Sequence, residues 1–131
     1  MKKESKKLAR KEVSKLIISC DDEKDIRDSV KQVLTDEGFR VMTAKNGRDL
    51  LDKLKIVKPD LILLDVLMPG MISKEILDEM KKRKLHIPII FLTVIRFAEQ
   101  ARMVIGPMVV AYIEKPFENS DLVRQVKMAL K

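Results

Sequence analysis

The chain has 131 residues, 46% of them hydrophobic and 36% charged, and a formal net charge of +7. This length fits one domain, and the apolar residues suffice for a core without disulfides or structural metals. No apolar run approaches the roughly 20 residues of a membrane helix, and none follows the charged N-terminus as a signal peptide would require. The single Cys20 indicates a reduced, buried thiol, so we expect a cytoplasmic protein that does not enter a membrane.

Most of the net positive charge lies in the first 15 residues. They hold seven Lys or Arg against Glu4 and Glu12, a net of +5, and the rest of the chain is close to neutral. A solvated basic arm is the plainer interpretation. Contact with nucleic acid or anionic lipid is disfavoured because no aromatic residues interleave the charges. We expect residues 1–14 to form a basic tail and residues 15–131 to fold as one domain.

Five short apolar runs have the length and composition of β-strands. They are rich in Leu and β-branched residues, and two of them are almost continuously apolar, as strands covered on both faces are. The predicted strands are residues 16–19, 39–44, 60–65, 87–93 and 109–113.

Amphipathic segments with apolar residues at helical spacing lie between these runs. Gly38 is placed to end the first, Pro59 closes the second, and Ser73 is a candidate N-cap of the third. Segment 96–105 has the weakest helical pattern. Strands that alternate with helices indicate right-handed crossovers and an α/β fold, a parallel sheet with helices on both faces. The predicted helices are residues 24–37, 47–57, 73–84 and 119–130.

Polar residues follow the predicted strands at the carboxyl edge of the sheet, where ligands of such folds bind. Each alone has a plain interpretation: a carboxylate can cap a helix, a Thr can be an ordinary strand residue, and a Lys can be solvated. Together they bring acids, a hydroxyl and an ammonium to one edge. Three clustered carboxylates resist joint ionisation unless a cation lies among them, and oxygen ligands suit Mg²⁺. The residues are Asp21, Asp22, Asp65, Thr93 and Lys115.

These residues stand in motifs that resemble the receiver domains of two-component response regulators, the family of the chemotaxis regulator. The resemblance covers residues 15–130 and rests on the segments IISCDDE, PDLILLDVLMPGM, IIFLT and YIEKPF. It implies a flavodoxin-like fold, a doubly wound five-stranded parallel sheet of order 2-1-3-4-5. It also implies a stand-alone phosphoacceptor domain that a histidine kinase or histidine phosphotransfer protein phosphorylates, and that signals to a downstream protein by changing shape.

The resemblance assigns roles to the acidic residues. Asp65 would be the nucleophile that becomes the aspartyl phosphate. Asp22 and Asp65 would bind Mg²⁺ directly, together with the backbone carbonyl of Leu67, and Asp21 would act through a bound water. The chain would then not be a conventional enzyme, but would catalyse its own Mg²⁺-dependent phosphorylation and a slow dephosphorylation.

The resemblance also assigns roles to residues of the fourth and fifth strands. Lys115 would neutralise a phosphoryl oxygen, and the peptide that joins it to Pro116 would be cis. Thr93 would donate its hydroxyl to the phosphoryl group. Tyr112 would be the aromatic switch that turns inward as Thr93 moves.

The chain departs from the family pattern in two places. Met108–Val109 replaces a Gly-Ala pair before Tyr112, and residues 108–111 are unusually apolar. Exposed apolar surface there would favour association, such as a homodimer, whereas burial is the alternative. Leu67 and Ile95 flank the acceptor site with apolar side chains that cannot orient an attacking water, so we expect a long-lived aspartyl phosphate.

Three other functions compete with this one. An aspartyl phosphohydrolase carries a second Asp two residues after its nucleophile, where this chain has Leu67. A nucleotide-binding domain needs a Gly-rich loop after the first strand, and CDDEKD is acidic where phosphate would lie. The remaining alternative is a receiver-like interaction module that is never phosphorylated. A protein that has lost its affinity for Mg²⁺ would indicate this alternative.

Overall fold

The computed structural model describes residues 14–65, 73–94 and 108–131, with only the backbone described for Ser73, Thr93 and Val94. The predicted helical segment 96–105 lies outside the described residues. Within the described ranges, no helix combines the length and the apolarity needed to cross a bilayer. The elements are β1 (Leu16–Cys20), α2 (Lys24–Asp36), β2 (Arg40–Ala44), α3 (Gly47–Lys53), β3 (Leu61–Asp65), α4 (Ser73–Lys82), β4 (Ile89–Val94), β5 (Val109–Lys115) and α6 (Asn119–Ala129).

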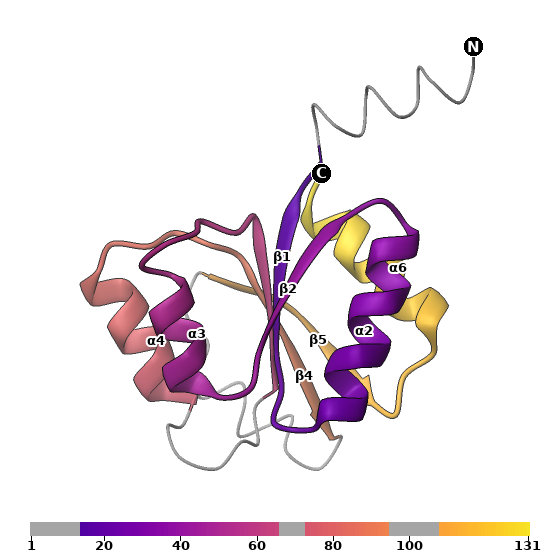
Figure 1. Ribbon diagram of the computed structural model, residues 1–131, viewed down its shortest axis with the longest axis horizontal. Coiled ribbons are helices and arrows are strands. Elements are labelled where there is room, and N and C mark those ends of the chain that lie inside the picture. Colours follow the sequence, from indigo (N-terminus) through magenta and orange to yellow (C-terminus); the bar gives the residue numbers. More distant parts are fainter. Residues whose placement is uncertain (1–13, 66–72, 95–107) are drawn as a thin grey trace.

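The five strands form one parallel sheet in the order β2-β1-β3-β4-β5, which confirms the predicted order. Helices α2 and α6 cover one face of this sheet, and α3 and α4 cover the other (Figure 1). Because all strands run the same way, their carboxyl ends meet at one edge, at the bottom of Figure 1. The residues that follow β1, β3 and β5 therefore all lie at this carboxyl edge of the sheet.

The core consists of two apolar layers, one on each face of the sheet. Successive strand residues point to opposite faces, so β3 contributes Ile62 and Leu64 to the layer under α3 and α4, and Leu61 and Leu63 to the layer under α2 and α6. All four are fully buried. Burying an aliphatic side chain of this size stabilises the fold by about 1.5–3 kcal/mol, so β3 is anchored on both sides just before the carboxyl edge.

Helix α2 ends one residue before the end of the predicted range 24–37. Its last helical residue is Asp36, and Gly38 adopts a positive φ of 97°. A residue without a Cβ takes this conformation at low cost, which explains why the helix stops and the chain turns into β2.

Helix α3 is shorter than predicted, since it ends at Lys53 rather than at residue 57. The backbone N–H groups of Lys55 and Ile56 donate to the carbonyls three residues back, those of Asp52 and Lys53, at 3.2 and 3.0 Å, so the chain tightens into a turn and the α-helix ends there. Leu54 is nevertheless buried and Val57 packs against the core. The apolar spacing therefore runs past the helix end, which made the prediction too long.

Strand β5 runs to Lys115, two residues beyond the predicted strand. Its pairing with β4 shifts between Ile89 and Ile90, so that Val109 and Ala111 pair with these two residues and Val110 is passed over. This irregularity leaves the Val110 side chain 52% exposed, whereas Val109 packs against the core. The apolar residues of this stretch are thus divided between the core and the surface.

Candidate functional site

Three carboxylates meet at the carboxyl edge of the sheet. Asp21 and Asp22 follow β1 directly, and Asp65 is the last residue of β3, the strand beside β1. One carboxylate oxygen from each residue lies within 4.8 Å of the other two. Asp21 and Asp65 are buried, whereas Asp22 is exposed to solvent. The cluster therefore joins two buried acids to one that is open to solvent.

Lys115 places an ammonium group beside the two buried acids. Its Nζ lies 2.8 Å from Asp21 Oδ2 and 3.5 Å from Asp65 Oδ2, and only 14% of its side chain is exposed. Burial acts to lower the pKa of Lys115, but the hydrogen bond to Asp21 and the charges of Asp65 and Asp21 outweigh it, so the pKa is raised. Lys115 is therefore a fixed positive charge at neutral pH. The peptide that joins it to Pro116 is cis, as the resemblance implies.

Asp21 forms hydrogen bonds through its backbone amide, its carboxylate and its backbone carbonyl. Its backbone N–H donates to the Ala44 carbonyl at 3.1 Å, and its carboxylate accepts from the Glu23 N–H at 3.0 Å and from Lys115. Its own carbonyl accepts from Arg27 Nη1 at 2.8 Å. Asp21 thus accepts from the N–H of Glu23, which is itself the N-cap residue of α2, and no side chain makes a cap hydrogen bond to this helix, so the plainer interpretation of a carboxylate that caps the helix is not confirmed.

The cluster has the composition of a divalent-cation site. Three carboxylates face one ammonium group, so negative charge remains in excess. At an effective dielectric constant of ~20, two like charges 4.8 Å apart repel by about 3.5 kcal/mol. The donors are all oxygen, which Mg²⁺ prefers, and the exposure of Asp22 leaves the site open to solvent. Asp21 accepts from Glu23 and Lys115, and Asp65 pairs with Lys115 at 3.5 Å, whereas Asp22 is the one carboxylate of the three that is exposed to solvent.

The other predicted site residues are described in part. Thr93 lies in β4, where its backbone pairs with Glu114 in β5, but its side chain lies outside the described residues. Leu67 and Ile95 lie outside them altogether. Tyr112 is half-buried in β5 on the face that α3 and α4 cover, with its ring centroid 5.9 Å from that of Phe91 and the rings tilted by 54°. Its hydroxyl oxygen is buried.

Cys20 lies next to the acids but is not poised to react. Its side chain is buried, as predicted, and its thiol donates to the Asn46 carbonyl at 3.4 Å. Burial, together with the negative charges of Asp21, Asp49 and Asp65, raises the pKa of this thiol to about 12. It therefore stays protonated at neutral pH, because the thiolate form is disfavoured.

Arg27 was missed by the sequence analysis. It lies in the first turn of α2 and contacts the backbone of the acidic loop. An Arg six residues after an acid carries no recognisable motif by itself. The signal that could have identified it is its position on the first turn of the helix that begins at the carboxyl edge.

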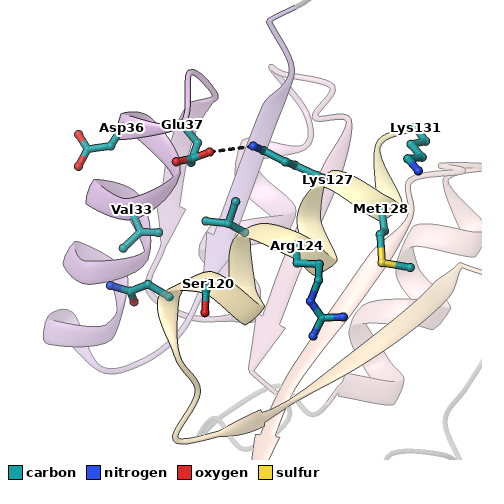
Figure 2. Close-up of a pocket in the computed structure, with 10 residues that line it drawn as sticks. Val33, Asp36, Glu37, Ser120, Arg124, Lys127, Met128 and Lys131 are labelled. Carbon is teal, nitrogen blue, oxygen red and sulfur yellow. Dashed lines mark ion pairs between the residues drawn. The ribbon is translucent and has the colours of Figure 1, made fainter.

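Two hollows flank α2. One, of about 400 Å³, lies beside Lys115 and has a mainly apolar lining surface, to which Ile26, Val30 and Phe117 contribute. The other, of about 750 Å³, runs between α2 and α6, where Lys127 and Glu37 form an ion pair of 2.8 Å (Figure 2). The larger groove contains none of the three carboxylates of the cluster, so size alone does not mark the functional site.

Comparisons with known proteins agree with this geometry. Residues 17–127 match the family model described as the response regulator receiver domain. The receiver domain of NtrX from Brucella abortus is 33% identical, with a TM-score of 0.80 over 87% of this chain and 97% of that domain. The longer NtrX structure from the same organism is 32% identical with a TM-score of 0.83, and the match covers 89% of this chain but only 27% of NtrX.

A second relative is a chemotaxis protein. The chemotaxis response regulator CheY4 of Vibrio cholerae is 27% identical, with a TM-score of 0.80 over 89% of this chain and 99% of CheY4. The family match, the strand order and these structural neighbours lead to one conclusion: this chain belongs to the response regulator receiver domains of two-component signalling systems.

Proposed function

We propose that this receiver domain accepts a phosphoryl group on Asp65, with Mg²⁺ in the acidic cluster, and signals through the resulting change of shape. The observation that carries the proposal is the grouping of Asp65 with Asp21, Asp22 and Lys115 at the carboxyl edge. Asp65 is buried except for a few per cent of its surface, at the end of a strand anchored on both faces. Its carboxylate is therefore held in one place, as an in-line displacement requires.

The chemistry proposed for the site is a single group transfer. A carboxylate oxygen of Asp65 attacks phosphorus, and the bond from phosphorus to the donor breaks as the new bond forms. Bound Mg²⁺ would neutralise charge on the phosphoryl oxygens. Asp22 and Asp65 would hold the cation together with the Leu67 carbonyl, and Asp21 would act through a water. Lys115 keeps its proton, because its pKa is raised, and would leave Asp21 to pair with a phosphoryl oxygen.

The proposed switch links the site to the β4–β5 side of the sheet. Phosphorylation adds negative charge and three acceptor oxygens, which would attract the Thr93 hydroxyl toward the acceptor. The backbone of Thr93 pairs with that of Glu114 in β5. Glu114 directly precedes Lys115 and lies two residues after Tyr112. Displacement of Thr93 would change the space open to the Tyr112 ring. The phosphoryl group is then the differential contact that favours one of two states.

The phosphodonor in this proposal is a histidine kinase or a histidine phosphotransfer protein. The apolar hollow beside Lys115 supports this, because Ile26 and Phe117 offer a docking surface at the mouth of the site. The output is a contact with a downstream protein. We also propose that residues 15–131 form the receiver domain and that residues 1–14 are a basic tail attached to it.

Phosphorylation itself provides the test. The protein is incubated with Mg²⁺ and acetyl phosphate, and its intact mass is compared with that of an Asp65→Ala variant treated in the same way. A gain of one phosphoryl group in the parent protein alone is expected. If the folded protein gains none from acetyl phosphate or from a panel of histidine kinases, the chain is an interaction module and the proposal is wrong.

A further inference from the structure

Arg27 reaches back from α2 to the loop that carries the acids. Its Nη1 donates to the Asp21 carbonyl at 2.8 Å, and its backbone N–H donates to the Glu23 carbonyl at 3.1 Å. The residue therefore contacts both ends of the stretch 21–23. Its side chain is half-buried, so this hydrogen bond is partly shielded from water.

The carbonyl that Arg27 holds belongs to the peptide unit between Asp21 and Asp22. A peptide unit is planar, so fixing its oxygen fixes the plane from which Asp22 departs. The amide and the carboxylate of Asp21 are tied by Ala44, Glu23 and Lys115. Asp22 itself is exposed, and its position relative to Asp65 depends on this peptide.

The hydrogen bond goes to a carbonyl and not to a carboxylate oxygen. Arg27 thus orders the loop while leaving the acids to bind a cation. Two effects of its guanidinium oppose each other, since its positive charge repels a divalent cation whereas its hydrogen bond holds the ligands in place. The direction in which Mg²⁺ affinity changes when Arg27 is removed therefore shows which effect dominates.

We propose that Arg27 is a positioning residue that sets the geometry of the acidic cluster through the Asp21–Asp22 peptide. The part of this inference that concerns Mg²⁺ rests on the proposed function, whereas the part that concerns the loop does not. Groups that orient metal ligands from outside change metal affinity by about 10–100-fold when removed. Arg27 acts through the backbone, so we expect a loss near the lower end.

Isothermal titration with Mg²⁺ tests the first part. Arg27→Ala is expected to bind Mg²⁺ about tenfold more weakly than the parent, and Arg27→Lys to recover part of the loss, because it keeps a donor and the charge. Lys31→Ala is the control, since it removes an exposed positive charge from the same helix. Its affinity should equal or slightly exceed that of the parent. An Arg27→Ala variant that binds as tightly as the parent, or more tightly, overturns the proposal.

Amide exchange in metal-free protein tests the second part independently. In Arg27→Ala, the Glu23 amide, which donates to Asp21, should exchange at least several-fold faster, while the amides of β3 stay unchanged. An unchanged Glu23 amide overturns the inference whatever Mg²⁺ does. Faster exchange at Glu23 in a protein whose parent does not bind Mg²⁺ supports the positioning role and contradicts the proposed function instead.

Discussion

Removal of the Lys115 ammonium should make the fold depend on Mg²⁺. Lys115→Met keeps an unbranched side chain of similar length but removes the ammonium group that pairs with Asp21 and Asp65. Both acids are buried, so their charges cannot be relieved by full hydration. We expect a protein that is destabilised in chelator and largely rescued by Mg²⁺, because the cation supplies the missing positive charge.

The size of the effect follows from the distances. At an effective dielectric constant of ~20, charges 2.8 Å and 3.5 Å apart attract by about 6 and 5 kcal/mol, and desolvation of the ions offsets much of this. Truncating one partner of a buried pair costs about 3–5 kcal/mol. We expect about 3 kcal/mol here, because Asp22 is exposed and admits water. For a domain of this size, that loss lowers Tm by roughly 10 °C.

The assay is urea unfolding followed by circular dichroism, in chelator and in saturating Mg²⁺. The control is Lys127→Met, which breaks a pair of the same 2.8 Å length with Glu37, but one whose side chains are 56% and 37% exposed. Such a pair contributes less than about 1 kcal/mol and should not respond to Mg²⁺. The reasoning is refuted if Lys115→Met is as stable as Lys127→Met in chelator, or if Mg²⁺ stabilises it no more than the parent.

Three further predictions concern Lys115, Cys20 and Leu67. The pKa of Lys115 is raised in the folded protein, so its charge contributes fully to stability below the unfolded value of 10.5, and this contribution is lost as the pH rises above that value. The difference in the free energy of unfolding between the parent and Lys115→Met, measured by urea titration, should therefore shrink from pH 9 to 11.5. Cys20, with a pKa of about 12, should resist a maleimide reagent at pH 8 and react only at the rate of unfolding; rapid labelling of folded protein would contradict its burial. Leu67→Asn should lose the phosphoryl group faster than the parent in a time course of intact mass, because the amide can orient an attacking water. If the parent loses its phosphoryl group rapidly and Leu67→Asn does so at the same rate, the prediction of a long-lived phosphate is wrong.

The sheet could be predicted from the sequence because two of its strands are almost continuously apolar. Residues 61–64 are four consecutive aliphatic residues, and the structure buries every one of them. Such a short, continuous aliphatic run is typical of a strand in a parallel sheet that is covered on both faces. Helix ends were harder, since Leu54 and Val57 contact the core from turns rather than from α3. Periodicity reports which side chains are buried, not which backbone hydrogen bonds continue.

The meeting of the acids could also be predicted, because parallel strands end at one edge. The partner of the Lys115 ammonium could not be predicted. The resemblance implies that it pairs with a phosphoryl group on Asp65, whereas in the structure it lies closer to Asp21 than to Asp65. Arg27 was likewise beyond prediction, because its contact depends on a side chain that folds back over the start of its own helix. Sequence patterns locate a residue on an element but do not give the rotamer that it adopts.

Chemical mapping shows directly whether Asp65 carries the phosphoryl group. The protein is phosphorylated with acetyl phosphate and Mg²⁺, the acyl phosphate is reduced with borohydride, which converts the modified aspartate to homoserine, and the digested peptides are analysed by mass spectrometry. Homoserine is expected at position 65 alone, with Asp21 and Asp22 unchanged. Homoserine at position 21 or 22, or at no position in a protein that has gained a phosphoryl group, would contradict it.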